Sequence, residues 1–342
     1  MTILGIETSC DETAAAILVQ DPQSKQITVA SHVVSSSLTT HAKTGGIIPE
    51  IAAREQLVFI LPVINEVLEK AFGKKLSQTP PPIDGIAVTH GPGLIGSLLV
   101  GVETARTLAL AWNKPIIPIN HMLGHIYANW IDHQEIIFPA VVLVVSGGHT
   151  DLLLLKNHGD YTVLGGTRDD AAGEAFDKIG RLLGLSYPAG PVIEELAKRG
   201  DPKRFRFPRP LLGSGDSDFS FSGLKTAVLR EVQKQKTLDE QTICDFARCM
   251  QDSICDVLVK KTLRAATECH AKSILLSGGV ASNQTLRDKF ANEMKNLHIQ
   301  ASLIYPERKY CTDNGAMIAA AALYNFLPVP WQDVTADPEM YY

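Results

Sequence analysis

The sequence predicts an α/β fold built from two similar lobes. Each half of the 342-residue chain opens with three short apolar segments separated by polar turns, and helices alternate with further strands after them. Self-similarity of this kind is typical of a duplicated unit, and alternating strands and helices are typical of a sheet covered by helices. We therefore expect two duplicated α/β lobes that face one cleft.

The first three strands of each half are indicated by aliphatic and β-branched runs bounded by turn-forming residues. They are expected over residues 2–7, 14–19 and 26–34 in the first half, and over residues 140–145, 150–155 and 161–165 in the second half. Each set of three adjoining strands predicts a small meander.

The later elements follow from the spacing of apolar residues. Helical spacing begins after Ile48-Pro49-Glu50 and returns over residues 237–271, where it predicts a core helix. Further helices are expected from Ser97 through Ala111 and over residues 173–183, and further strands over residues 84–89, 115–119 and 273–276.

These elements divide the chain into an N-terminal lobe over residues 1–130, a C-terminal lobe over residues 131–325 and a C-terminal tail over residues 326–342. An insertion over residues 199–226 interrupts the second lobe. Basic residues alternate there with phenylalanines: Lys203, Arg204, Arg206 and Arg209 with Phe205, Phe207, Phe219 and Phe221. Such a segment could be a lid or a surface that contacts nucleic acid, and it could equally be a solvated loop anchored by its phenylalanines.

Composition narrows the class of protein. The chain is 45% hydrophobic and 20% charged with a formal net charge of −5, which is typical of a globular protein, so any contact with nucleic acid needs a local basic patch or a partner. No uninterrupted apolar run of membrane-spanning length and no signal peptide is apparent, so we expect a cytoplasmic protein without membrane contact. Six cysteines without a CxxC pair indicate reduced packing residues.

A metal site is indicated by the stretch 119–130. If this stretch is helical, His121 and His125 project from one face, where two imidazoles can bind one divalent ion. Asp313, at the start of an Ala-rich helix, is the best third ligand, and two His with one Asp leave open positions for chemistry. Two histidines at this spacing are also common as ordinary core or surface residues. A zinc peptidase is disfavoured because Met122 stands where its general base Glu would be.

A phosphate-binding function is indicated by four loops at the ends of predicted strands. They span residues 8–13, 91–97, 146–149 and 277–283. Glycines let a backbone approach phosphate closely at such loops, although no P-loop and no GxGxxG after the first strand is present. Asp177, in a predicted helix, could accept hydrogen bonds from ribose or be an exposed helical charge, and Gly190 is expected in the turn after that helix.

Several of these segments together resemble one known family. They are residues 3–13, 45–50, 90–94, 120–125, 145–150, 173–178, 221–226 and 278–283. In this order they closely resemble the TsaD family, the tRNA threonylcarbamoyladenosine transferases once described as glycoprotein endopeptidases. The resemblance implies a duplicated actin-like ATPase (ASKHA) fold with two lobes around a central nucleotide cleft. It also implies transfer of threonylcarbamoyl from threonylcarbamoyl-AMP to N6 of the adenosine adjacent to the anticodon, in tRNAs reading codons that start with A.

The resemblance also assigns roles to residues. His121, His125 and Asp313 would bind one divalent metal ion per chain, Fe2+ or Zn2+. The adenylate ligand, threonylcarbamoyl-AMP or possibly ATP or ADP, would contact Val145, Ser146, Gly147, Gly148, His149, Asp177, Gly190 and Asn283. Ser9 would lie at the reacting end with Asp11 and Glu12, and the candidates for accepting the amine proton are Asp11, Glu12 and His149. One departure is that Arg54 is followed by Glu55 and Gln56, where the family often has Arg-x-His.

The expected partners follow from the same resemblance. They are tRNA, a TsaB-like actin-fold paralogue in a heterodimer, and a TsaE-like P-loop ATPase, as in bacterial members. Three alternatives stay open at this point: an actin-like small-molecule kinase, which would not need the His121, His125 and Asp313 set; a metallopeptidase; and a non-catalytic scaffold.

Overall fold

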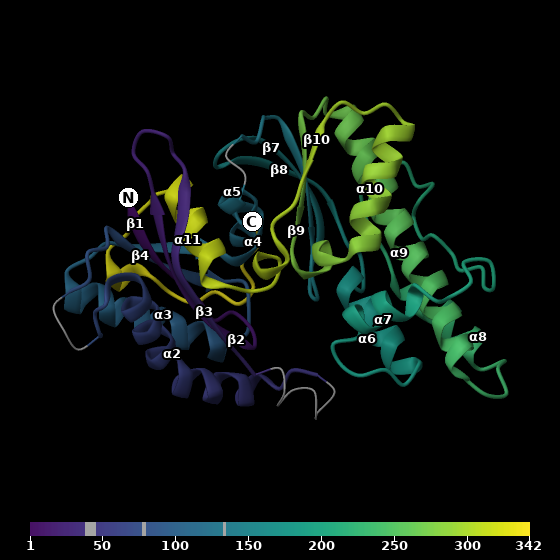
Figure 1. Cartoon of the computed structure of the whole chain (residues 1–342), viewed down its shortest axis with the longest axis horizontal. Coiled ribbons are helices and arrows are strands. Elements are labelled where there is room, and N and C mark those ends of the chain that lie inside the picture. The colour runs from purple at the N-terminus through teal and green to yellow at the C-terminus, as the bar shows by residue number, and fades with distance from the viewer. Residues whose placement is uncertain (38–45, 77–79, 133–134) are drawn as a thin grey trace. The chain divides into compact units, whose positions relative to one another are not determined.

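The computed structural model describes residues 1–37, 46–76, 80–132 and 135–342 (Figure 1). Most of the expected glycine-containing loop over residues 41–46, Gly45 included, lies outside these residues. The chain forms two compact units, Met1–Glu135 with Pro306–Tyr342, and Ile136–Tyr305. This division differs from the predicted one, because residues 306–342 return to the first unit instead of completing the second. Local sequence patterns do not reveal such a return, since it depends on long-range packing.

The sheet of the first unit has the strand order β3-β2-β1-β4-β5. β1 (Thr2–Glu7), β2 (Glu12–Gln20) and β3 (Ile27–Ser36) form an antiparallel meander, and β4 (Gly85–Gly91) and β5 (Ile116–Asn120) continue the sheet parallel to β1. The meander and both parallel strands match the sequence prediction. Because β1, β4 and β5 run parallel, their carboxyl ends meet at one edge of the sheet.

Helices cover both faces of this sheet. Leu4 and Ile6 pack into a core with α2 (Pro49–Phe72) and α3 (Ile95–Trp112). Gly5, which alternates with them, faces α11 (Gly315–Tyr324) so closely that a Cβ there would lie 2.2 Å from the Gly315 carbonyl oxygen. The close contact fixes the start of α11, and therefore the segment before it, against β1.

One helix, α3, is long and apolar enough to cross a membrane by length and composition. It is not an uninterrupted apolar run, because Glu103 and Arg106 lie within it. Half of its residues are buried inside the protein, and it packs against β4 and α2. A core helix with one face on a sheet and one on a neighbouring helix meets the same criteria.

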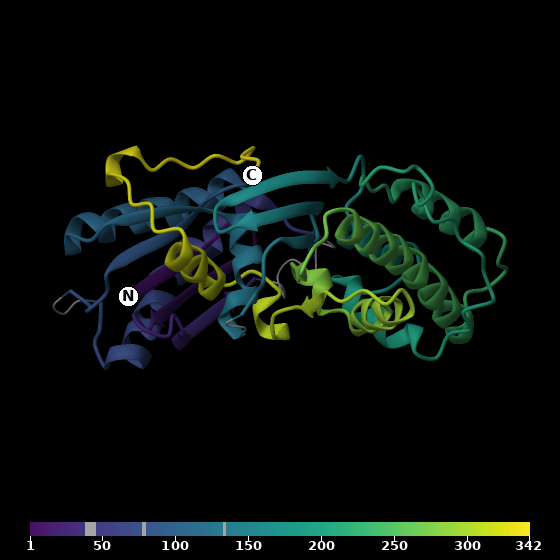
Figure 2. The same ribbon diagram turned by 90° about the horizontal axis from the view of Figure 1, so that it is seen from above.

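The last residues of the chain are attached to the first unit. After α11, the backbone N–H of Val329 donates to the Ile116 carbonyl (3.0 Å), and that of Asp337 donates to the His90 carbonyl (2.7 Å). A short 3-10 helix, η3 (Trp331–Asp333), lies between these contacts. Figure 2 shows this yellow segment running away from α11 and back again. The predicted tail is therefore an ordered strap along β5 and the end of β4.

The second unit repeats the first sheet. Its strand order is β10-β9-β6-β7-β8. β6 (Ala140–Val145), β7 (Thr150–Asn157) and β8 (Asp160–Gly166) form the antiparallel meander, and β9 (Ser273–Ser277) and β10 (Ser302–Ile304) extend it parallel to β6. The two sheets share one connectivity, which confirms the duplication predicted from sequence.

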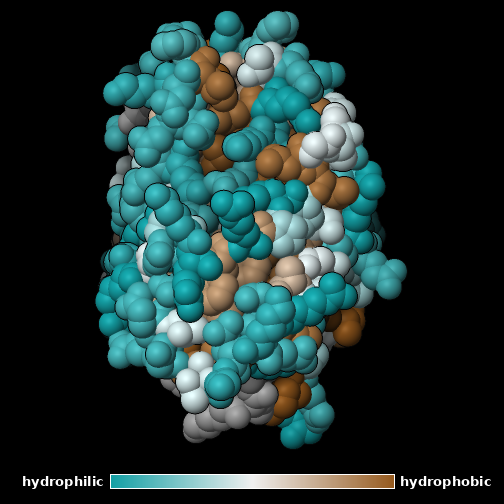
Figure 3. All heavy atoms as spheres, turned by 90° about the vertical axis from the view of Figure 1, so that its right-hand side faces the viewer, coloured by the Kyte–Doolittle hydropathy of each residue, from teal (hydrophilic) through white to brown (hydrophobic). Residues whose placement is uncertain are grey.

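The helices of the second unit build a single core with β6 and β7. They are α6 (Ala172–Leu182), α7 (Ala189–Ala197), α8 (Ser222–Val232), α9 (Glu240–Glu268) and α10 (Gln284–Asn296). Viewed from the right of Figure 1, the surface is mainly hydrophilic with separate apolar patches (Figure 3). All six cysteines of the chain are free, and four are buried.

The insertion over residues 199–226 is held by this core. Phe205 stacks on Phe246 of α9 with 4.0 Å between ring centroids, and Phe219 and Phe221 are fully buried. Arg209 donates to Asp256 of α9 at 2.8 Å. Its phenylalanines therefore anchor the segment, a feature that a solvated loop and a surface for nucleic acid can share.

Candidate metal centre and substrate loops

The two histidines of the predicted metal site lie on one short helix. α4 spans His121–Tyr127, and its N-cap is Asn120, whose side-chain oxygen accepts hydrogen bonds from Met122 N (2.8 Å) and Leu123 N (3.2 Å). This cap satisfies two of the otherwise unpaired N–H groups of the first turn. It fixes His121 and His125 on one face, with 4.7 Å between their ring centroids.

Asp313 meets these histidines from the returning segment of the chain. It precedes Asn314, which caps α11 by accepting a hydrogen bond from Met317 N at 2.9 Å. The Oδ1 atom of Asp313 lies 3.1 Å from Nε2 of His125 and 3.6 Å from Nε2 of His121. One ligand atom from each of the three residues lies within 4.8 Å of the others, so a single ion can contact all three.

The chemistry of these residues fits a metal ion. His125 is 1% exposed. Within the described part of the chain its Nδ1 has no hydrogen-bond partner, and its Nε2 has the 3.1 Å contact with Asp313, which does not have the geometry of a hydrogen bond. An unsatisfied buried polar group costs about 1–3 kcal/mol. His121, His125 and Asp313 would hold a divalent cation, which would give the buried Nε2 of His125 a partner, and two imidazoles with one carboxylate are ordinary ligands for zinc or iron.

Glu7, at the end of β1, orients His121, a role that the sequence pattern does not predict. It is fully buried and accepts hydrogen bonds from Ser9 N (2.5 Å) and Thr89 Oγ1 (2.5 Å), while its Oε2 lies 3.1 Å from Nδ1 of His121. With Nδ1 held by a carboxylate, Nε2 is the atom presented toward Asp313. In the sequence, the feature that could indicate this role is a carboxylate at the end of a mainly apolar strand.

Charge in this cluster favours a protonated His121 when no ion is bound. Burial alone would lower the pKa of His121, but the nearby carboxylates of Glu7 and Asp313 raise it to about 9. A cation there must therefore displace a proton, which is the usual linkage between metal binding and pH.

The polar turn between β1 and β2 lies beside the metal ligands. The Oγ atom of Ser9 is 3.1 Å from Nδ1 of His121. Burial, with the nearby Asp11 and Asp313, raises the pKa of Glu12 to about 9, and Ser36 donates to its Oε1 at 3.0 Å. The structure thus brings Ser9 to the predicted metal site. It also places Glu12 close enough to Asp313 for the negative charge of Asp313 to raise the pKa of Glu12.

In the second unit, the turn after β6 presents its glycines to solvent. Ser146 N donates to the His149 carbonyl (2.9 Å), and the Ser146 carbonyl accepts from Gly173 N (3.1 Å) at the start of α6. Gly147 and Gly148 are exposed, with open space where a Cβ would point. Gly278, after β9, has φ +88° and packs on the Val145 carbonyl. The ends of β6 and β9 and the first turn of α6 therefore meet, while the buried Val145 side chain belongs to the core.

Asp177 and Gly190 lie together at the start of α7. The Asp177 carboxylate accepts a hydrogen bond from Ala189 N at 2.7 Å, so it is not the exposed helical charge that sequence allowed. Burial raises its pKa, although the N–H groups of Ala189 and Gly190 act in the opposite direction. Gly190 is the second residue of α7 and not part of a turn before it, which corrects the expected position. The helix starts early because Asp177 caps it from a neighbouring helix.

Asn283 caps α10. Its side-chain oxygen accepts from Leu286 N (3.0 Å), and its Nδ2 donates to Oε1 of Gln251 on α9 (2.9 Å). The side chain is 6% exposed. Both the oxygen and the nitrogen of the Asn283 amide thus have protein partners. The side chain therefore holds the loop before α10 in place.

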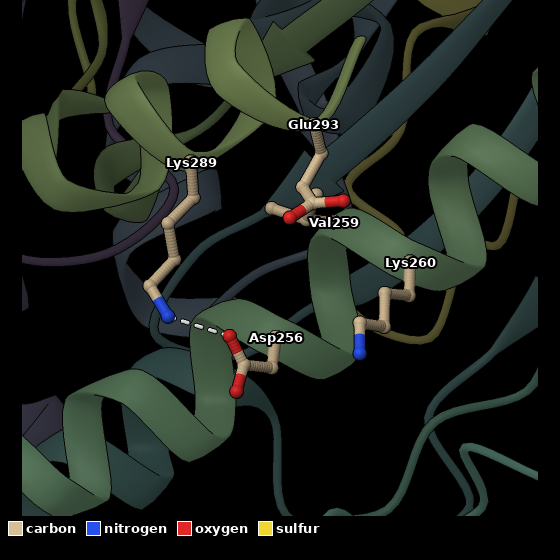
Figure 4. Close-up of a pocket in the computed structure, with 5 residues that line it drawn as sticks. All are labelled: Asp256, Val259, Lys260, Lys289 and Glu293. Atoms are coloured by element: carbon tan, nitrogen blue, oxygen red, sulfur yellow. Dashed lines mark hydrogen bonds and ion pairs between the residues drawn. The ribbon is translucent and has the colours of Figure 1, made fainter. Parts of the chain in front are cut away.

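A recess elsewhere in the second unit is lined by none of the site residues described above. It lies between α9 and α10, where Lys289 points at Asp256 with 2.5 Å between Nζ and Oδ1, beside Val259, Lys260 and Glu293 (Figure 4). An ion pair that already satisfies its charges is a structural contact between helices. None of the predicted site residues lines this recess.

Comparison with known proteins decides the family. The model of the TsaD family, described as tRNA N6-adenosine threonylcarbamoyltransferase, matches residues 28–320. The chain belongs to the TsaD family. Relatives with that same name include proteins of Moorella thermoacetica, 48% identical over 95% of this chain and 92% of its own, and Anaeromyxobacter sp., 45% identical over 99% of both. The TsaD relative of Symbiobacterium thermophilum is 49% identical over 94% of this chain and 91% of its own.

Solved structures agree on the fold. HypF of T. kodakarensis superposes with a TM-score of 0.62 at 14% identity, over 95% of this chain and 48% of that one. Component A of the Acidaminococcus fermentans (R)-2-hydroxyglutaryl-CoA dehydratase superposes with a TM-score of 0.55 at 16% identity, over 95% and 98%. These likenesses confirm the actin-like ATPase fold. As a TsaD-family member the chain is a transferase that modifies tRNA, and the His121, His125 and Asp313 cluster fits a metal-dependent enzyme.

Proposed function

We propose that this chain transfers the threonylcarbamoyl group from threonylcarbamoyl-AMP to N6 of the adenosine adjacent to the anticodon, in tRNAs that read codons starting with A. The N6 amine attacks the carbamoyl carbon, a C–N bond forms, the bond from that carbon to the phosphate oxygen breaks, and AMP leaves while the amine loses a proton. The observation that carries this proposal is the His121, His125 and Asp313 cluster, with Ser9 beside it, in a chain of the TsaD family.

His121, His125 and Asp313 would hold one divalent ion, Fe2+ or Zn2+. When bound, such an ion supplies positive charge for an anionic part of the donor. Glu7 keeps Nε2 of His121 directed toward Asp313 through its contact with Nδ1. The donor is a mixed anhydride and already activated, so the work of the residues is alignment and stabilisation of charge.

The turn that carries Ser9, Asp11 and Glu12 would hold the reacting end of the donor. Its hydroxyl and N–H groups can bind the carbamoyl oxygen or the phosphate. Burial and the nearby carboxylates of Asp11 and Asp313 raise the pKa of Glu12, which favours a protonated carboxyl there in the metal-free protein. Asp11, Glu12 and His149 are the proton acceptors to test.

The loops of the second unit would bind the adenylate moiety of threonylcarbamoyl-AMP, ATP or ADP. Exposed Gly147 and Gly148 follow a strand, and the first turn of α6 packs against the same turn, an arrangement suited to phosphate. The other proposed contacts are Val145 and Ser146 through their backbone, His149, Asp177, Gly190 and Asn283. Because Asp177 and Asn283 already have protein partners, their contribution would include holding the starts of α7 and α10.

The tRNA surface would include the exposed cations of the insertion. Lys203, Arg204 and Arg206 are exposed, and none of the three forms an ion pair within the described ranges. Arg209, by contrast, is occupied by Asp256. Stacking of Phe205 on Phe246 holds the segment in place, so these cations are presented without a large cost in chain entropy.

Partner binding would use α2 and α3. Large apolar side chains are exposed on these adjacent helices: Leu57, Val58, Phe59 and Leu61 on α2, and Ile95, Leu99 and Leu110 on α3. A patch of this kind is typical of a protein interface. We assign it to the TsaB-like paralogue, with a TsaE-like P-loop ATPase as the further partner, and we place the complex in the cytoplasm.

The test supplies synthetic threonylcarbamoyl-AMP and unmodified tRNA to the purified chain with its bacterial-type partners, and measures the nucleosides by mass spectrometry. A tRNA that reads A-starting codons should gain threonylcarbamoyladenosine, and a control tRNA that reads other codons should not. Phosphorylation of a small molecule from ATP without any modified nucleoside would instead favour the kinase alternative.

A further inference from the structure

A buried glutamine on α2 contacts the backbone of the turn that carries Ser9, Asp11 and Glu12. Gln56 is 1% exposed. Its Nε2 donates to the Cys10 carbonyl (3.0 Å) and the Glu12 carbonyl (3.0 Å), and lies 3.4 Å from the Thr8 carbonyl oxygen. One side chain therefore contacts three alternate carbonyls of a single turn.

The orientation of the Gln56 amide is set by these partners. All three neighbours are acceptors, so the opposite orientation would place Oε1 against three carbonyl oxygens. In the observed orientation, Oε1 is buried and has no hydrogen-bond partner within the described part of the chain. A buried amide oxygen left in this state costs about 1–3 kcal/mol. At this position, therefore, only the N–H groups of the Gln56 side chain form hydrogen bonds, and its oxygen forms none within the described residues.

The same turn is tied to α3 by a second donor. Ser97 Oγ donates to the Cys10 carbonyl at 3.0 Å, and Thr8 Oγ1 donates to the Ser97 carbonyl at 2.9 Å. The carbonyls of the turn are thus directed at the two helices. Since backbone carbonyls on both sides of Ser9 and Asp11 are held, the positions of these two residues relative to His121 depend on Gln56 and Ser97.

We infer that Gln56 is a positioning residue for the transfer step: by donating to the carbonyls of Cys10 and Glu12 it fixes the turn that holds Ser9, Asp11 and Glu12. This inference rests on the proposed function for its effect on the rate, but not for its effect on the turn. What the position requires is an N–H donor and not an amide as such. A neutral histidine has a nitrogen at the same number of bonds from Cα and can donate one hydrogen bond there.

The experiment compares Gln56→Met, which keeps length and removes the N–H groups, with Gln56→His, which retains one. Gln20→Met is the matched control, because Gln20 is another buried glutamine of the same unit at 7% exposure. We expect Gln56→Met to lower kcat about 100-fold with KM for tRNA within twofold, the size of effect that small misplacement of reacting groups produces. Hydrogen exchange at the amides of residues 9–13 should accelerate, and Gln56→His should recover both properties to within about tenfold.

The exchange measurement separates this inference from the proposed function. If wild type transfers nothing, the proposed function fails, yet faster exchange confined to residues 9–13 in Gln56→Met would still establish that Gln56 holds the turn. Unchanged exchange in that variant, or equal losses in Gln56→Met and Gln56→His, would overturn the inference. If Gln56→Met does not fold, Ser97→Ala removes a donor from the same Cys10 carbonyl. It should give a smaller change in the same direction, and no change there would also overturn the inference.

Discussion

The Nε2 atom of His125 lies 3.1 Å from Oδ1 of Asp313, although His125 precedes the whole second unit of the chain and Asp313 follows it. The contact exists because α11 packs on β1 through Gly5 and Gly315, which brings the segment before α11 back to α4. A metal site in this protein therefore depends on closure of the first unit by residues 306–342.

Glu7→Gln should weaken metal binding without removing a ligand. The substitution takes away the carboxylate that holds Nδ1 of His121, and changes of this kind cost about 10–100-fold in metal affinity. The dissociation constant for Zn2+ can be measured by competition with a chromophoric chelator. Glu194→Gln, which alters a carboxylate of the second unit that accepts from Gln284 N, is the control and should bind as wild type. Equal affinity in Glu7→Gln would show that Glu7 does not orient the ligand.

Glu12→Gln should stabilise the metal-free protein, and increasingly so as pH rises. The folded protein keeps the Glu12 proton up to about pH 9, whereas the unfolded chain loses it near the ordinary value of 4.5. Between these values the folded state binds more protons than the unfolded state, so the free energy of unfolding of wild type falls as pH rises. The variant has no such group. Its Tm should lie close to that of wild type near pH 5 and exceed it at pH 8 by roughly 5–10 °C, because three pH units between the two pKa values correspond to about 4 kcal/mol. The same increase in Tm at both pH values would contradict the raised pKa of Glu12.

Replacing Lys203, Arg204 and Arg206 with alanine should weaken tRNA binding through charge alone. Three lost phosphate contacts should reduce the slope of log K against log salt by roughly 2. The control replaces Lys198, Lys234 and Lys309, which removes the same charge but takes cations already paired with glutamates at 2.5–2.7 Å. Filter binding at several salt concentrations measures both. The same slope in both triple variants would show that tRNA does not bind Lys203, Arg204 and Arg206.

Leu57→Asp with Leu61→Asp should disrupt binding of the TsaB-like paralogue. Both side chains are at least half exposed on α2, so the monomer should fold, while a charge placed in an apolar interface costs more than about tenfold in affinity. Light scattering after size exclusion gives the mass of the complex. Leu297→Asp, at an exposed leucine of the second unit, is the control. If the heterodimer still forms with the double substitution, this face of α2 is not the interface with the TsaB-like paralogue.

Much of the fold follows from local pattern. Alternation and turn residues predicted both meanders, and the spacing of His121 and His125 predicted a shared face, because strand and helix periods act over a few residues. The return of residues 306–342, the capping of α7 by Asp177 and the contacts of Glu7 and Gln56 were missed or left open. Each depends on which distant backbone a side chain meets, and a sequence period carries no such information. Gly190 was misplaced for the same reason, since its helix begins at a cap supplied by another helix.

The most direct test of the account measures bound metal and transfer in the same preparations of wild type, Asp313→Ala and the control Asp333→Ala, which changes an exposed aspartate of the same unit. Elemental analysis gives metal per chain, and mass spectrometry gives threonylcarbamoyladenosine formed from threonylcarbamoyl-AMP and tRNA in the presence of the partners. We predict about one ion per chain and full transfer in wild type and Asp333→Ala, with both lost in Asp313→Ala. A folded Asp313→Ala protein that keeps its metal and transfers at the wild-type rate would contradict the site.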